Sequence, residues 1–96
     1  MQSRHEEVVV SQTLTVRCRL FARYAEIAGT PDLTLQLPVH STVGDAVAWL
    51  RSHLAGGQGL PPRPMAAVNA VHARLEDEVH DGDEIALLPP LAGGVA

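Results

Sequence analysis

Two neighbouring segments of this 96-residue chain alternate strictly between apolar and polar side chains, and this alternation limits the fold more than any other feature. The apolar positions of the first segment are Leu14, Val16, Cys18 and Leu20, and those of the second are Leu33, Leu35 and Leu37. A period of two predicts half-buried strands, and the two segments are close enough along the chain to pair as in a hairpin. The same alternation puts Phe21 on the face of Arg17 and Arg19, away from the core.

The longest predicted helix follows the second strand. Ser41 or Thr42 can cap its N-terminus, and Asp45 lies near the positive end of its dipole. Apolar residues then recur at helical spacing along one face: Val43, Ala46, Val47, Leu50 and Leu54. We expect Gly56-Gly57 to close this helix, and we expect a shorter helical turn over residues 22–28 to end at Gly29 in the left-handed conformation.

The second half of the chain predicts two more strands, at residues 65–71 and 85–88, with Asn69 at a turn. Before them, residues 59–64 are rich in glycine and proline and predict a surface connection. Between them, six acidic residues occur within nine positions around Asp81-Gly82-Asp83, which favours a solvated turn over a docking patch. Pro89 and Pro90 have no N–H to donate, so strand pairing should end there and release the tail.

The order strand, strand, helix, strand, strand is typical of a two-layer α+β fold. In such a fold one main helix packs across one face of a small mixed sheet, which is the β-grasp architecture. A chain of this length has room for one domain. We therefore expect a mobile leader at residues 1–12, a β-grasp domain at residues 13–90, and a flexible C-terminal tail with Gly-Gly at residues 91–96.

Composition argues against several classes of function. The net charge of −4 and the aromatic content of 3% argue against nucleic-acid binding, which needs basic surfaces and stacking rings. Cys18 is the single cysteine, which predicts a buried structural thiol and no internal disulfide. The five histidines show no metal-ligand spacing. No stretch reaches transmembrane length and residues 1–10 are too polar for a signal peptide, so we expect a cytoplasmic location and no membrane partner.

The printed sequence closes with Leu91-Ala92-Gly93-Gly94-Val95-Ala96. A Gly-Gly end acts chemically only if the carboxyl group of the second glycine is the reactive group. Because glycine has no Cβ, such a tail can enter a channel too narrow for any other residue. The sequence contains no glycine-rich phosphate loop followed by Lys and Ser or Thr, so activation of a carboxylate would require another protein.

A family resemblance rests on three stretches: Ala66-Ala67-Val68-Asn69, the run from Asp81 through Pro90, and Gly93-Gly94. Leu20-Phe21-Ala22 and Ser41-Thr42-Val43 add to it. Over about residues 14–94 the chain resembles the ubiquitin-like sulfur carriers of the ThiS type, and above all the small subunit of molybdopterin synthase. The combination of a last strand, Pro-Pro and Gly-Gly is specific, whereas each piece alone is a weak signal.

The resemblance implies a non-catalytic carrier subunit. Gly94 would carry sulfur as a C-terminal thiocarboxylate, after an E1-like activating enzyme adenylates it with ATP and Mg²⁺ and a sulfur donor protein supplies the sulfur. The tail would insert into the large subunit of molybdopterin synthase through Leu91, Ala92, Gly93 and Gly94. The expected partner interface consists of Phe21, Leu88, Arg17, Arg19 and Pro90. The chain itself is expected to bind no cofactor and no metal.

Val95 and Ala96 depart from the family pattern, because they place the free carboxylate beyond Gly94. They could be removed in the cell, belong to a precursor or a longer fusion, be a cloning remnant, or mark a protein that no longer carries sulfur. Processing in the cell or a precursor is the favoured interpretation. Three other functions stay open: a sulfur carrier for thiamine, cysteine or tRNA thiolation, a ubiquitin-like modifier attached to lysines through Gly94, and an interaction module with an inert tail.

Overall fold

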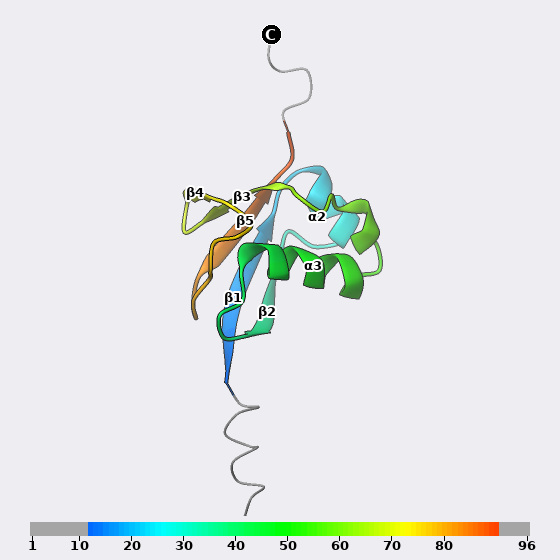
Figure 1. Cartoon of the computed structure of the whole chain (residues 1–96). Coiled ribbons are helices and arrows are strands. Elements are labelled where there is room, and N and C mark those ends of the chain that lie inside the picture. The colour runs from blue at the N-terminus through cyan, green and yellow to red at the C-terminus, as the bar shows by residue number, and fades with distance from the viewer. Residues whose placement is uncertain (1–11, 91–96) are drawn as a thin grey trace, which may run out of the picture.

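A parallel pair of strands, β1 (Thr13–Leu20) and β5 (Glu84–Leu88), forms the centre of a five-stranded sheet in the computed structural model, which describes residues 12–90 (Figure 1). β2 (Asp32–Pro38) pairs antiparallel with β1, and β3 (Met65–Val68) pairs antiparallel with β5. β4 (Val71–Ala73) lies on the far edge, which gives the order β2-β1-β5-β3-β4. The predicted β-grasp fold, with its mixed sheet and one main helix, is confirmed.

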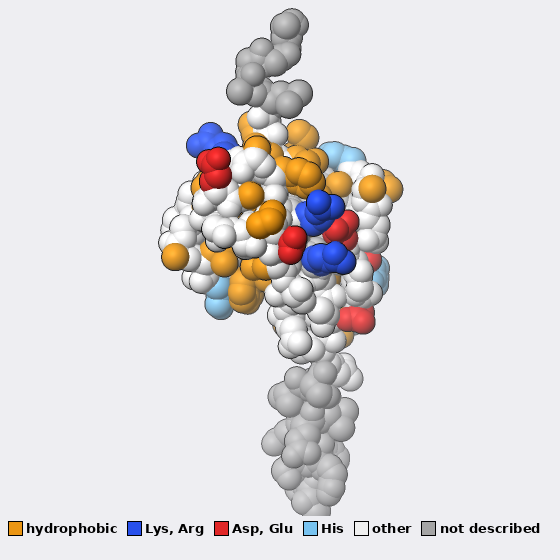
Figure 2. All heavy atoms as spheres, turned by 180° about the vertical axis from the view of Figure 1, so that it is seen from behind, with side chains coloured by type: hydrophobic (Ala, Val, Ile, Leu, Met, Phe, Trp, Pro, Cys, Tyr) orange, Lys and Arg blue, Asp and Glu red, His pale blue; other side chains and the backbone are white. Residues whose placement is uncertain are grey.

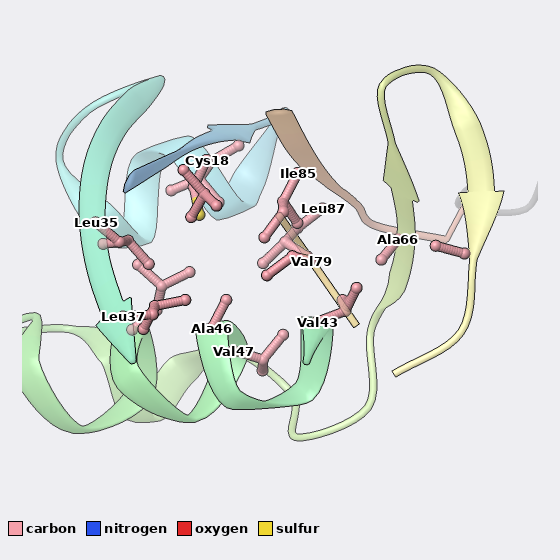
Figure 3. Packing of buried hydrophobic residues seen from close by; sticks show 14 of the residues in the cluster. Cys18, Leu35, Leu37, Val43, Ala46, Val47, Ala66, Val79, Ile85 and Leu87 are labelled. Carbon is pink, nitrogen blue, oxygen red and sulfur yellow. The ribbon is translucent and has the colours of Figure 1, made fainter. Parts of the chain in front are cut away.

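The main helix, α3 (Val43–His53), runs across the strands in Figure 1, and a short helix, α2 (Arg23–Ala28), follows β1. A 3₁₀ turn at Gly57–Gly59 comes after α3. Figure 3 shows Val43, Ala46 and Val47 of α3 directed toward Ile85 and Leu87 of the sheet. All five of these side chains are at most 1% exposed, so the core lies between α3 and one face of the sheet.

The alternation in the first strand is confirmed residue by residue. Leu14, Val16, Cys18 and Leu20 are buried, and the residues between them are exposed. Phe21 is 38% exposed and lies outside the core as predicted. The apolar stripe therefore determines which face of β1 is covered by the helix, because every second side chain of a strand points to the same side.

The start of α3 is confirmed and its end is corrected. The hydroxyl of Thr42 accepts a hydrogen bond from the N–H of Asp45 at 3.1 Å, and the carboxylate of Asp45 accepts one from the N–H of Thr42 at 2.9 Å. This reciprocal capping box satisfies two N–H groups that the helix cannot pair internally. The helix ends at His53 with Leu54 extended, earlier than the expected closure at Gly56-Gly57, which belong to the turn that follows.

The strand predicted at residues 65–71 is two strands. Asn69 and Ala70 adopt positive φ values of 51° and 71°, and they form a tight turn between β3 and β4. The side chain of Asn69 holds this turn on β5, since its Oδ1 accepts from the N–H of Glu84 at 3.0 Å and its Nδ2 donates to Asp83 at 2.9 Å. The structure therefore has five strands where the sequence predicted four. Two residues with positive φ are enough to divide one predicted strand into a hairpin.

The connection at residues 59–64 was predicted to lie on the surface, but part of it is buried. Leu60 is 1% exposed and belongs to the core, and Pro64 is also buried. The side chain of Arg51 fixes this loop to α3, because its Nε donates a hydrogen bond to the carbonyl of Leu60 at 2.8 Å. The glycine and proline residues correctly predicted a segment without α-helix or strand. A single leucine is nevertheless enough to anchor such a loop in the core.

The acidic segment shapes turns, as favoured from the sequence. Backbone N–H groups donate to three of its carboxylates: Thr15 to Asp81 at 2.7 Å, His80 to Asp83 at 2.8 Å, and Arg74 to Asp77 at 2.9 Å. Val79, inside the segment, is fully buried. The carboxylates thus accept hydrogen bonds from backbone N–H groups that no neighbouring strand pairs. Within residues 12–90, no helix has the length and apolar character needed to cross a membrane.

Leu20 and Phe21 provide a test of the two faces. Leu20→Ala should lower the free energy of unfolding by about 2–5 kcal/mol, because Leu20 is only 3% exposed and its truncation opens a cavity in the core. Phe21→Glu should lower it by less than about 1 kcal/mol, because the ring is largely outside the core. Urea denaturation followed by circular dichroism measures both, and equal losses for the two variants would contradict the assignment of faces.

Cys18 provides a second test of the core. Its side chain is fully buried, and burial raises the pKa of the thiol to about 12. Because the thiolate is the reactive form, we expect almost no reaction of the native protein with a chromogenic disulfide reagent at mildly alkaline pH. In concentrated guanidinium chloride one thiol per chain should react rapidly. Fast reaction of the native protein would show that Cys18 is accessible.

Candidate functional site

The ends of the two central strands lie side by side, and this is where the candidate site forms. β1 and β5 run parallel with Leu20 opposite Leu87, so Phe21 and Leu88 emerge at the same end of the sheet. Met65, at the start of β3, lies opposite Leu88 on its other side. Since Leu87 points into the core, Leu88 points to the outer face and is partly exposed.

These side chains form an apolar groove at the point where the last strand ends. The groove has a volume of about 620 Å³ and is lined by Phe21, Ala22, Arg23, Met65, Leu88, Pro89 and Pro90. Met65 is 49% exposed and Phe21 is 38% exposed, so the apolar surface is open to solvent. Figure 2 shows hydrophobic side chains gathered toward the end of the molecule at which the described part of the last strand stops. Exposed apolar side chains collected in one place mark an interaction surface more often than scattered ones do.

Arginine side chains flank the groove on the outer sheet face. The guanidinium of Arg19 lies 5.5 Å from the centre of the Phe21 ring, which is within the range of a cation–π contact. The same guanidinium lies 3.8 Å from the carboxylate of Glu84 on β5. Arg17 is exposed on this face one further alternation away from Phe21. Arg19 therefore orients the ring and borders the groove, whereas Arg17 lies beyond it.

The backbone at Ala22 is responsible for the sharp exit from β1. Ala22 has φ of 51° and ψ of −126°, a conformation that a residue with a Cβ adopts at a cost. This turn starts α2 immediately after Phe21 and leaves the ring outside the core. The local sequence does not predict this backbone conformation, because alanine is an ordinary helix residue.

Three of the predicted interface residues meet in the groove: Phe21, Leu88 and Pro90. Met65 was not predicted to belong to this surface, because its position depends on the register between β3 and β5. The alternation around the buried Ala66 was the one signal that could have placed Met65 on the outer face. The predicted tail residues Leu91, Ala92, Gly93 and Gly94 lie outside the described residues.

The chemistry available on the folded body is limited. In the part of the chain from 12 to 90, no three His, Cys, Asp or Glu side chains converge to hold a metal ion. The groove is lined by apolar side chains and one arginine, none of which is a nucleophile or a general base at neutral pH. The described residues of the groove thus offer apolar side chains and one guanidinium for contact.

Comparison with known proteins agrees with this description. Residues 18–94 match the family model described as ThiS family. The chain is 30% identical over 84 residues to the "Molybdopterin synthase sulfur carrier subunit" of Arabidopsis thaliana, covering 88% of both chains. It is 34% identical to "Small archaeal modifier protein 1" of Haloferax volcanii, covering 79% of this chain and 97% of that protein.

The fold is also that of a solved relative. The crystal structure of SAMP1 from Haloferax volcanii superposes with a TM-score of 0.73 at 30% sequence identity, covering 83% of this chain and 99% of that one. The family match extends over most of the sequence and includes the end of β1, from Cys18 to Leu20, together with α3, β5 and Gly94. This chain therefore belongs to the ThiS family of small β-grasp proteins.

Proposed function

We propose that this protein is a sulfur carrier, the non-catalytic small subunit of a molybdopterin synthase, which donates sulfur from a thiocarboxylate on Gly94 after removal of Val95-Ala96. The observation that carries the proposal is the apolar groove of Phe21, Met65, Leu88 and Pro90 around the point where β5 ends. A partner that covers this groove receives the residues after Pro90 directly. The name of the Arabidopsis thaliana relative, a sulfur carrier subunit, supports the same function.

The reach of the chain fits a carrier. The six residues from Pro89 to Gly94 span at most about 20 Å when extended, which is enough to enter a deep partner site while the folded body stays at its mouth. Pro89 and Pro90 restrict the first two backbone φ angles, so less conformational entropy is lost when the following residues insert. Glycine at 93 and 94 removes the side chains that a narrow channel would exclude.

The proposed reaction uses the chain as an acyl carrier. One oxygen of the Gly94 carboxylate attacks the α-phosphorus of ATP on an E1-like activating enzyme, which forms the acyl adenylate and releases pyrophosphate. Hydrogen sulfide ion (HS⁻) supplied by the sulfur donor protein then attacks the acyl carbon, AMP leaves, and a thiocarboxylate forms with loss of the thiol proton. The large subunit holds the cyclic pyranopterin precursor that accepts the sulfur. ATP and Mg²⁺ belong to the activating enzyme, and the proposal places these steps in the cytoplasm.

Removal of Val95-Ala96 is part of the proposal, because the reactive carboxylate has to belong to Gly94. The family match ends at Gly94, so the last two residues of the printed sequence lie beyond the shared pattern. Side chains at these two positions would also oppose entry into a channel fitted to glycine.

A protein modifier is the second candidate function, and one observation favours it. "Small archaeal modifier protein 1" of Haloferax volcanii is 34% identical to this chain. In that role Gly94 would form an amide with a lysine of a target protein. This chain has no lysine, so it could be attached once but could not be extended through its own ε-amines. Conjugates of increased mass in extracts of the host would favour this function over sulfur transfer.

The sulfur-carrier proposal predicts a defined mass change. Incubated with the activating enzyme of the same genome, ATP and a sulfur source, the chain ending at Gly94 should gain the mass difference between sulfur and oxygen. The chain ending at Ala96 should not. Gly94→Ala in the shortened chain should abolish transfer and change the free energy of unfolding by less than about 0.5 kcal/mol. Intact-mass spectrometry measures the product, and absence of sulfur on the Gly94-ended chain would refute the proposal.

The groove predicts the effect of charge on partner binding. Phe21→Glu should weaken binding to the large subunit of the same genome about tenfold or more, because it places a carboxylate in an apolar interface. Val39→Glu is a matched control, since Val39 is 37% exposed and lies outside the groove. Isothermal titration calorimetry measures both. Equal affinities of the two variants would show that the groove is not the interface.

A further inference from the structure

A second groove lies beside the apolar one. It has a volume of about 630 Å³, and it shares Arg23, Met65, Leu88 and Pro90 with the apolar groove. Three of its lining side chains are arginines: Arg23 from the start of α2, Arg51 from the last turn of α3, and Arg63 from the loop before β3. We call this the basic groove. Its position means that a partner covering the apolar groove also borders the basic one.

The charge of the basic groove contrasts with that of the whole chain. The chain has a net charge of −4, yet none of the residues lining this groove within the described part of the chain is acidic. The apolar part of the lining comes from the prolines at 61, 62 and 64 and from Tyr24 and Leu60, which are almost fully buried. Three guanidinium groups around a partly apolar surface favour an anionic ligand with some length.

One of the three arginines is held in place, and a second forms an exposed ion pair. Nε of Arg51 donates to the carbonyl of Leu60 at 2.8 Å, and the carbonyl of Arg51 accepts from the side chain of Gln58 at 2.9 Å. Nη2 of Arg63 lies 3.4 Å from Glu76, just outside the groove. The pKa of Glu76 is lowered by a hydrogen bond from its own backbone N–H and by Arg63. Glu76 is exposed, so this pair leaves Arg63 accessible to a second carboxylate.

We infer that the basic groove binds a carboxylate-rich segment of the protein partner that covers the apolar groove. The three arginines are complementary in charge to carboxylates, and the two grooves share four residues. A protein segment fits better than nucleic acid, since the one aromatic ring that lines the basic groove, Tyr24, is 4% exposed and is not available to stack on a base. The inference relies on the proposed function only for the identity of the partner, because the groove and its charge are properties of this chain.

Exposed charges at the edge of an interface act mainly on the association rate. Arg23 and Arg63 are exposed, so their attraction for an acidic segment should be screened by salt. The apolar groove beside them would then supply most of the binding free energy. Together the two surfaces would orient a partner about the end of β5, with acidic groups on the helix side and apolar groups on the sheet side.

The first test needs no cognate partner. Hexaglutamate is titrated into the labelled full chain at low salt, and the side-chain Nε–Hε signals of the arginines are followed by NMR, with hexaglutamine as the neutral control. Saturable shifts at Arg23, Arg51 and Arg63 with smaller ones at Arg17, Arg19 and Arg74 would support the inference. Equal shifts at these six of the seven arginines, or no shifts, would overturn it.

The second test uses the large subunit of the same genome. Arg23→Gln and Arg63→Gln should each lower the association rate constant about threefold or more at about 0.05 M NaCl, and the effect should shrink at about 0.5 M. Arg74→Gln removes the same charge outside both grooves and is the matched control. Arg51 is left unchanged because it also holds Leu60.

The outcomes of the two tests separate this inference from the proposed function. If the large subunit binds and Phe21→Glu weakens binding, but Arg23→Gln and Arg63→Gln behave like Arg74→Gln, the basic groove is not used and the inference is wrong. If hexaglutamate binds the basic groove and the large subunit does not bind the chain at all, the choice of partner in the proposed function is wrong and the acidic-ligand site stands.

Discussion

The parallel pairing of β1 and β5 is the constraint on which the rest of the structure depends. It joins the first described strand to the last, with Leu20 opposite Leu87, and so brings both strand ends to the same side of the sheet. Phe21 is far in sequence from Leu88 and Pro90, yet all three line one groove because of this register. An antiparallel arrangement of the same two strands would put the end of β5 at the opposite side of the molecule, away from Phe21.

Polar contacts at the other end of the sheet fix that register. The N–H of Thr15 donates to Asp81, the N–H of Gly82 donates to the carbonyl of Thr15, and the N–H of Arg17 donates to the carbonyl of Asp83. These bonds determine where β5 begins relative to β1. Because β5 is only five residues long before the prolines, its start also determines its end. The acidic turn therefore influences a binding surface that it does not touch.

Much of this architecture could be predicted from the sequence, and what could not has identifiable physical reasons. Periodicity is a local property, so β1, β2, α3 and β5 could be read directly, and so could the exposure of Phe21. The turn at Asn69 was predicted, but the division of residues 65–71 into two strands was not, because two residues interrupt a strand pattern too briefly to change its period. Leu60 was missed because a loop rich in glycine and proline gives no sign of its single anchor. The grooves depend on pairing between distant segments, which no local pattern encodes.

The termination of the last strand has a consequence beyond architecture. Within the described residues, hydrogen-bonded pairing of the last strand ends at Leu88, and the two prolines that follow have no N–H with which to extend it. A chain shortened to end at Pro90 would therefore keep every strand and every core side chain described above. Under the proposed function, such a shortened chain would compete with the intact form for the partner and transfer no sulfur.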